Sequence, residues 1–136
     1  MVKSIVTDII FLGQKSEPAT QDDISTADDL LDTLRANSDR CVGMAANMIG
    51  VKKCIIVFEA DGTYCEMFNP KIIRQSQQYE TVEGCLSLTG TRMVRRFQSI
   101  KVQWQNRKFQ TRIKNFEGWT AQIIQHEIDH CNGIII

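Results

Sequence analysis

QHEIDHCNGIII, residues 125–136, contains both histidines of the chain, His126 and His130, with Glu127 directly after the first. Residues four apart lie on the same face of a helix, one turn above each other, so the two imidazoles can bind one metal ion. A glutamate beside the first ligand can reach a water on that ion and accept its proton. The spacing therefore predicts a catalytic metal site on a helix.

A catalytic ion of this kind usually takes three protein ligands and leaves one position for water. Cys131 points about 100° around the helix from the second histidine, so the third ligand must precede the helix. There is no other histidine, which leaves cysteines or carboxylates. Cys54 and Cys65 fall in apolar strand patterns, which are typical of buried thiols. Cys41 and Cys85 lie in turn-prone stretches, and the spacing favours Cys85.

The remaining pattern predicts an α+β fold. Apolar residues recur at helical spacing in 21–37 and in 117–131, and a glycine ends the second helix. Strands are predicted on both sides of a turn at Asp61-Gly62, and also at 71–74, 79–83, 99–104 and 108–113.

Length and composition indicate one soluble domain over residues 1–136. The hydrophobic share of 43% and the charged share of 24% are ordinary for such a domain. A net charge of zero argues against nucleic acid or an anionic membrane as a partner. Residues 84–116 nevertheless contain eight Lys and Arg and no Asp or Glu. This stretch is either the solvent face of a sheet or a patch for an acidic partner or a peptide carboxylate.

The five cysteines indicate where the protein works. Their number is odd, and no secretory signal or membrane-spanning run accompanies them. We therefore expect a cytoplasmic protein with reduced thiols.

Three motifs resemble those of the peptide deformylase family, G-x-G-x-A-A-x-Q, E-G-C-L-S and Q-H-E-x-D-H. The second is complete at 83–87 and the third at 125–130. The first appears as CVGMAANM, residues 41–48, and the likeness extends from about residue 22 to the end. The resemblance implies short antiparallel strands packed around a central C-terminal helix.

The resemblance also implies a reaction. Cys85, His126 and His130 would bind one divalent ion, most often Fe²⁺ in this family and otherwise Zn²⁺ or Ni²⁺. Glu127 would act as general base and then as acid, and the backbone N–H of Leu86 would donate to the oxyanion. The implied activity removes formate from the N-formyl-methionine of new bacterial or organellar proteins. The partners would be N-formyl-methionyl peptides, bound by a monomer.

Residues at the family's substrate-binding positions follow from the same resemblance. They are Val42, Gly43, Met48, Glu83, Gly84, Arg92, Trp119 and Ile123. Val42, Trp119 and Ile123 would form the pocket for the methionine side chain, although helix packing alone also buries an isoleucine. Arg92 would contact the peptide beyond the methionine, and a solvated surface arginine is an equally good interpretation.

Two substitutions separate the chain from the family pattern. Met48 replaces the glutamine that donates to the oxyanion, and a thioether cannot donate a hydrogen bond. Losing one such donor typically lowers the rate by about 10²- to 10³-fold, unless Asn47 or a water replaces it. Cys41 replaces a glycine and narrows the substrate groove. The alternatives are therefore a related hydrolase with weak activity or activity on another small amide, and a non-catalytic formyl-peptide-binding protein. Since the chain stops soon after the metal helix, docking on the ribosome is not expected.

Overall fold

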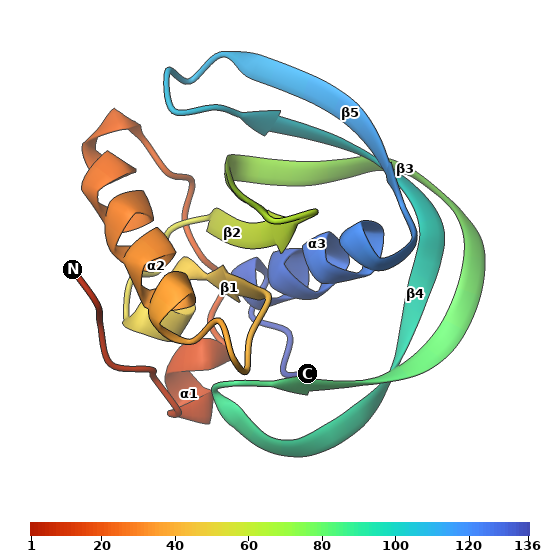
Figure 1. The fold of residues 1–136 in the computed structure, drawn as a ribbon, viewed down its shortest axis with the longest axis horizontal. Coiled ribbons are helices and arrows are strands. Elements are labelled where there is room, and N and C mark those ends of the chain that lie inside the picture. Colours follow the sequence, from red (N-terminus) through yellow and green to blue (C-terminus); the bar gives the residue numbers. More distant parts are fainter.

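Five antiparallel strands form one sheet in which each strand pairs with the next one along the chain (Figure 1). The computed structural model describes all of residues 1–136. The strands are β1 (Gly43–Ala45), β2 (Ile55–Ala60), β3 (Thr63–Cys85), β4 (Leu88–Gln105) and β5 (Thr111–Glu117). The helices are α1 (Ile9–Leu12), α2 (Ile24–Ala36) and α3 (Gly118–Cys131), with short 3-10 helices at Gln21–Asp23 and Ala46–Ile49. No helix has the length and apolar character that spanning a membrane requires.

The strands β3 and β4 are longer than the short strands that the sequence pattern predicts. The segments expected at 71–74 and 79–83 both belong to β3, which has 23 residues, and the segment at 99–104 lies inside β4, which has 18. Asn69 and Gln77 interrupt the strand pattern with φ values of +52° and +63°. The register of β3 against β4 also shifts near the first of them. These irregularities bend β3 instead of ending it.

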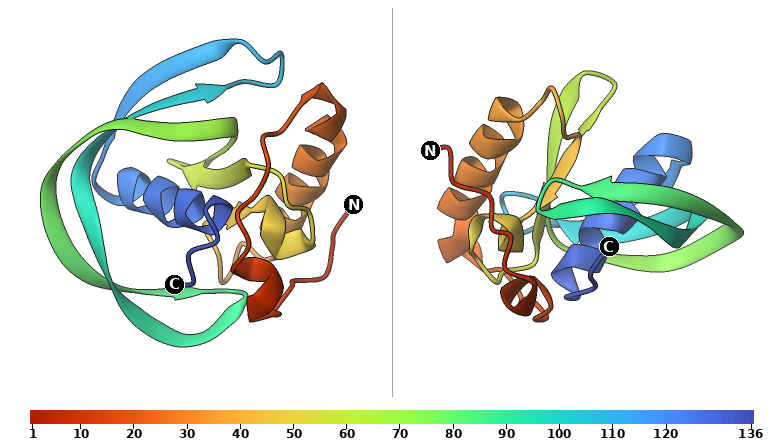
Figure 2. Two further views of the ribbon diagram at one scale, coloured as in Figure 1. Left: turned by 180° about the vertical axis from the view of Figure 1, so that it is seen from behind. Right: turned by 90° about the horizontal axis from the view of Figure 1, so that it is seen from below.

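The helix α3 lies in the hollow of the curved sheet, as Figures 1 and 2 show. Its Ala121, Ile124 and Ile128 pack with apolar side chains of β2 and β4. The helix ends before Gly133, whose φ is +72° and where a Cβ atom would lie 2.6 Å from the carbonyl oxygen of Gly13. The predicted α+β architecture, with antiparallel strands around a C-terminal helix, is confirmed.

The strand β2 separates two clusters of buried apolar side chains. Adjacent strand residues point to opposite faces of a sheet. Ile56 and Phe58 accordingly pack with α3, while Ile55 and Val57 pack with α2, around Leu30. The strand β2 is therefore covered on both faces, by α3 on one side and by α2 on the other.

Candidate metal centre and active site

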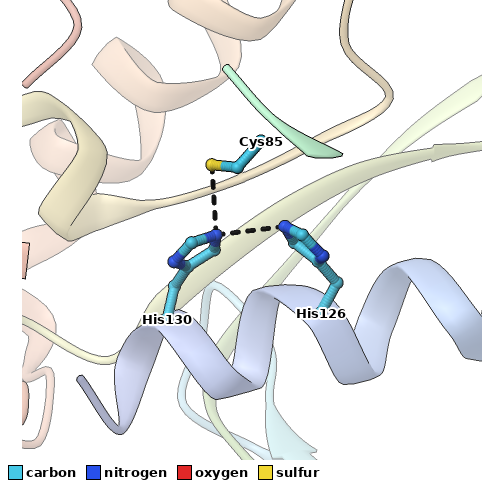
Figure 3. A group of neighbouring side chains, drawn as sticks. All are labelled: Cys85, His126 and His130. Carbon is cyan, nitrogen blue, oxygen red and sulfur yellow. Dashed lines mark hydrogen bonds between the residues drawn. The ribbon is translucent and has the colours of Figure 1, made fainter. Parts of the chain in front are cut away.

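The three predicted metal ligands meet at the end of β3 and on the inner face of α3 (Figure 3). The Cys85 Sγ lies 3.3 Å from the His130 Nε2, which lies 3.1 Å from the His126 Nε2. Ligands of a tetrahedral ion with bonds of about 2.0–2.3 Å are roughly 3.3–3.6 Å apart. The three atoms are therefore placed to bind one divalent ion, and Cys85 is the third ligand that the helix requires.

Glu83 orients the first imidazole. Its Oε1 lies 2.7 Å from the His126 Nδ1. With Nδ1–H donating to this carboxylate, Nε2 keeps its lone pair for a metal. Burial raises the pKa of Glu83, but hydrogen bonds from His126, Arg96 and Gln122 outweigh burial and lower the pKa to about 2. The carboxylate is therefore ionised at any pH at which the protein works.

Arg96 holds Glu83 in place. Its guanidinium donates through Nε and Nη2 to the two oxygens of Glu83, at 2.9 and 2.7 Å, and through Nη1 to Asp129 at 2.6 Å. The arginine is only 4% exposed, although it belongs to the basic stretch that the sequence reads as a solvent face or a patch for an acidic partner. One signal in the sequence could have indicated this burial. Arg96 lies two residues after the apolar Val94, so both side chains point to the same face of β4.

His130 is the more deeply buried of the two imidazoles, with no exposed surface. Burial lowers the pKa of His130 to about 3. The imidazole is consequently neutral near pH 7, the form in which histidine binds metals. Its Nδ1 has no hydrogen-bond partner in the protein.

Glu127 lies next to the triad without belonging to it. It is 4% exposed, and its Oε1 has no hydrogen-bond partner. Burial raises the pKa of Glu127 to about 7. A carboxyl group with a pKa near the working pH can both accept and return a proton, as a general base and acid must.

Gly43 allows Glu127 to occupy this position. A Cβ atom on Gly43 would lie 2.8 Å from both the Glu127 Oε2 and the Ile123 Cγ2. Real Cβ atoms do not approach other atoms this closely. The second glycine of the first motif is therefore a requirement for close approach between β1 and α3.

We expect Gly43→Ala to lower kcat/KM by about 10²-fold, because it displaces the Glu127 carboxylate by a fraction of an ångström to an ångström. No metal ligand contacts Gly43, so the metal content should not change. Formate release and metal analysis on one preparation check both points. A fully active Gly43→Ala enzyme would contradict the assigned close approach.

A cavity of about 580 Å³ opens beside the triad. It is lined by most of the predicted substrate residues and by the predicted oxyanion donor, namely Val42, Gly43, Met48, Glu83, Gly84, Trp119, Ile123 and Leu86. Trp119 is 62% exposed, so it stands at the mouth, whereas Ile123 is buried in the wall. The cavity therefore combines apolar walls with a metal-binding end.

Arg92 is the predicted substrate residue that does not line this cavity. It pairs with Glu83 across β3 and β4 and is half-buried. Its Nη1 is buried without a hydrogen-bond partner. Its contact with the peptide remains a prediction that depends on its place seven residues after Cys85.

Met48 reaches the cavity at the position of the family's glutamine. Its sulfur accepts a long hydrogen bond from the Ala45 N–H, at 3.5 Å. Asn47 does not replace the missing donor, because its Nδ2 donates to the carbonyl oxygen of His130 at 2.9 Å and its side chain is outside the cavity lining. The N–H of Leu86 donates to no protein acceptor. It is therefore free to bind an oxyanion.

Cys41, the other candidate ligand, is not part of the triad. It lines the cavity, but its thiol donates to the carbonyl oxygen of Gly43 at 2.8 Å. Burial raises the pKa of Cys41 to about 12, which disfavours the thiolate that a metal binds. All five cysteines are free thiols.

Known proteins with similar sequences and folds are peptide deformylases. The polypeptide deformylase family matches residues 5–136. The peptide deformylase of Clostridium beijerinckii is 55% identical over 136 residues, the whole of both chains. That of Heliobacterium modesticaldum is 38% identical over 128 residues, which are 91% of this chain and 83% of the relative.

Solved structures agree with the sequence comparison. The peptide deformylase of Thermotoga maritima superposes with a TM-score of 0.90 at 26% identity, covering 99% of this chain and 95% of that one. The class I type b peptide deformylase of Acinetobacter baumannii with bound Met-Ala-Ser gives a TM-score of 0.89 at 25% identity, covering 99% of this chain and 97% of that one.

Proposed function

The chain belongs to the peptide deformylase family of metal-dependent amide hydrolases, and from this we propose that it removes formate from the N-formyl-methionine of newly made proteins. We propose that residues 1–136 form one catalytic domain that acts as a monomer on N-formyl-methionyl peptides. The observation that carries this proposal is the Cys85–His126–His130 triad with Glu127 beside it at the end of a cavity.

The residues around the cavity have separate roles in the proposed reaction. Cys85, His126 and His130 would hold a divalent ion, which would lower the pKa of a bound water from 15.7 to about 7. Glu127 accepts the proton of the attacking water and later gives it to the departing amine. The Leu86 N–H donates to the oxyanion that forms at the formyl oxygen. Glu83 keeps His126 oriented throughout.

We propose Fe²⁺ as the resident ion, with Zn²⁺ or Ni²⁺ as substitutes. One thiolate and two neutral imidazoles are suitable ligands for all three metals. The metal identity can be tested by measuring turnover of protein that has been loaded with each ion under anaerobic conditions.

We propose that the formylated peptide lies in the cavity with its methionine side chain against Val42, Trp119 and Ile123. Gly43, Met48, Glu83 and Gly84 would complete its walls, and Arg92 would contact residues after the methionine. The cavity lining supports all of these except Arg92. The Acinetobacter baumannii relative binds Met-Ala-Ser.

Formate release from N-formyl-Met-Ala-Ser by metal-loaded protein tests the proposed function. Turnover that depends on the added metal supports deformylation. If fully metallated protein releases no formate, the proposal fails. Assays of other small N-acyl amines would then test the second candidate, which the Met48 substitution favours because it alters what the site stabilises.

We expect Met48→Gln to raise kcat by about 10- to 100-fold, because a carboxamide of similar size adds a second donor to the oxyanion. The gain should appear in kcat, with little change in KM, since the donor acts on the transition state. Steady-state kinetics on N-formyl-Met-Ala-Ser measure both constants. A variant with unchanged kcat would mean that two donors already act in the natural protein.

A further inference from the structure

One residue on the α3 face of the cavity wall is polar and does not belong to the metal centre. The face of α3 that lines the cavity consists of Trp119, Gln122, Ile123, His126 and Glu127. Gln122 places a carboxamide one helical turn before His126. A polar group placed among the apolar side chains of a binding cavity usually fixes the orientation or the identity of a ligand.

Two hydrogen bonds hold the carboxamide of Gln122 in one orientation. Its Oε1 accepts from the Tyr79 hydroxyl at 3.2 Å, and its Nε2 donates to the Glu83 Oε2 at 2.8 Å. Because Glu83 is an ionised acceptor, the nitrogen must be on its side. The nitrogen carries a second hydrogen, and no protein acceptor binds it. This second N–H points away from Glu83 and is available to a molecule in the cavity.

The first side chain of a bound substrate can reach this N–H. The formyl carbon must lie at the metal end, beside His126, and the Cα atom of the first residue is only two bonds away from it. Side chains four residues apart on a helix are about 5–6 Å apart at their Cβ atoms. A side chain as long as methionine covers that distance from the metal centre to Gln122.

We propose that Gln122 is a specificity-determining residue that selects a first side chain carrying a hydrogen-bond acceptor near its end. This inference rests on the proposed function and narrows its substrate class. The thioether of methionine is a weak acceptor, and the oxygen of methionine sulfoxide is a stronger one. Norleucine has the same length but no acceptor, so it leaves the Gln122 N–H buried and unpaired, which is unfavourable.

Three substrates that differ only at the end of the first side chain test the proposal. They are the N-formyl tripeptides X-Ala-Ser in which X is norleucine, methionine or methionine sulfoxide. We expect kcat/KM of the natural protein to rise in that order, with about a tenfold difference between the first and the last. In Gln122→Leu the order should reverse, because position 122 then presents an apolar side chain with no hydrogen-bond donor. Gln122→Met provides a second apolar variant if the leucine variant does not fold.

The ratio of kcat/KM between two substrates distinguishes substrate selection by Gln122 from a structural effect of its replacement. Loss of the hydrogen bond to Glu83 alters the metal centre equally for all three peptides, so it cancels in the ratio. Gln98→Leu makes the same chemical change at an exposed position of β4 and should leave the ratio unchanged. If the natural protein and Gln122→Leu rank the three peptides identically, the proposal is overturned.

A binding measurement keeps this test independent of turnover. The unformylated tripeptides can be titrated into the metal-loaded protein, with the fluorescence of Trp119 at the cavity mouth as the signal. The same rank order of Kd values is expected, with the same reversal in Gln122→Leu. If formate is never released but the binding order reverses, the proposed function fails and the role of Gln122 stands. If formate is released but Gln122→Leu ranks the peptides as the natural protein does, the proposed function stands and the role of Gln122 fails.

Discussion

Glu127→Gln is expected to lower kcat/KM for N-formyl-Met-Ala-Ser by about 10²- to 10⁴-fold while the metal stays bound. The carboxamide has the size of the carboxylate but cannot accept a proton. Glu127 contributes no atom to the triad, so its replacement leaves the ligand set complete. Formate release and metal content, measured on the same preparation, give the two values that the prediction requires.

The metal-free protein offers an independent check on Glu127. Burial raises its folded-state pKa to about 7, above the ordinary value of 4.5. A carboxyl group with a raised pKa binds its proton more tightly in the folded state, so stability is lost as the pH rises from 4.5 to 7. Glu127→Gln removes this loss and should melt at a higher temperature than the natural protein above pH 7.

A matched control is available directly before the same helix. Glu117 precedes α3, is exposed, and makes no capping hydrogen bond with its side chain. Glu117→Gln should therefore leave the rate unchanged. Near-normal turnover in Glu127→Gln would contradict the assignment of this residue as the proton carrier.

Local signals explain why the sequence predicts the metal helix. The histidine pair His126 and His130 and the helix-ending Gly133 lie within about two helical turns of one another. Cys85 could be chosen as third ligand because its neighbours are turn-forming residues. All of these features depend on residues close together in the chain, where periodicity is informative.

The residues that support the ligands depend on pairing between distant segments. Arg96 reaches Glu83 because β3 and β4 pair in one particular register, and Gln122 reaches it across 39 positions of sequence. A register shift of one residue would turn either strand's side chains to the other face. Neither contact can be derived from periodicity. The burial of Arg96, within the basic stretch 84–116, was therefore not predicted.

The family resemblance predicts the location of some substrate residues better than that of others. Met48 occupies the place that the first motif assigns, inside the cavity, whereas Arg92, which follows the second motif, is outside the cavity lining. The first motif contains β1, which pairs with β2 and packs so closely on α3 that no Cβ atom fits at Gly43. Arg92 follows the β3–β4 turn, where its side chain depends on the course of two long, bent strands.

Cys85→Ser is expected to abolish turnover by removing the metal, with a fall in kcat/KM of at least about 10²-fold. A serine hydroxyl stays protonated near pH 7 and cannot replace a thiolate. Two imidazoles alone leave the ion with half of a tetrahedral ligand set. Metal analysis after gel filtration should find the natural protein loaded and this variant depleted, whereas Glu127→Gln remains loaded.

The contrast between these two variants separates binding from chemistry. Cys65→Ser is the matched control, since Cys65 is a half-buried strand thiol outside the triad, and it should keep both metal and activity. Thermal melting of the metal-free proteins should be alike for Cys85→Ser and the natural chain, because the half-exposed thiol has little packing to lose. If Cys85→Ser retained its full metal content, another group would have to be the third ligand. Cys41, the other cysteine in the cavity wall, would then be the first residue to replace.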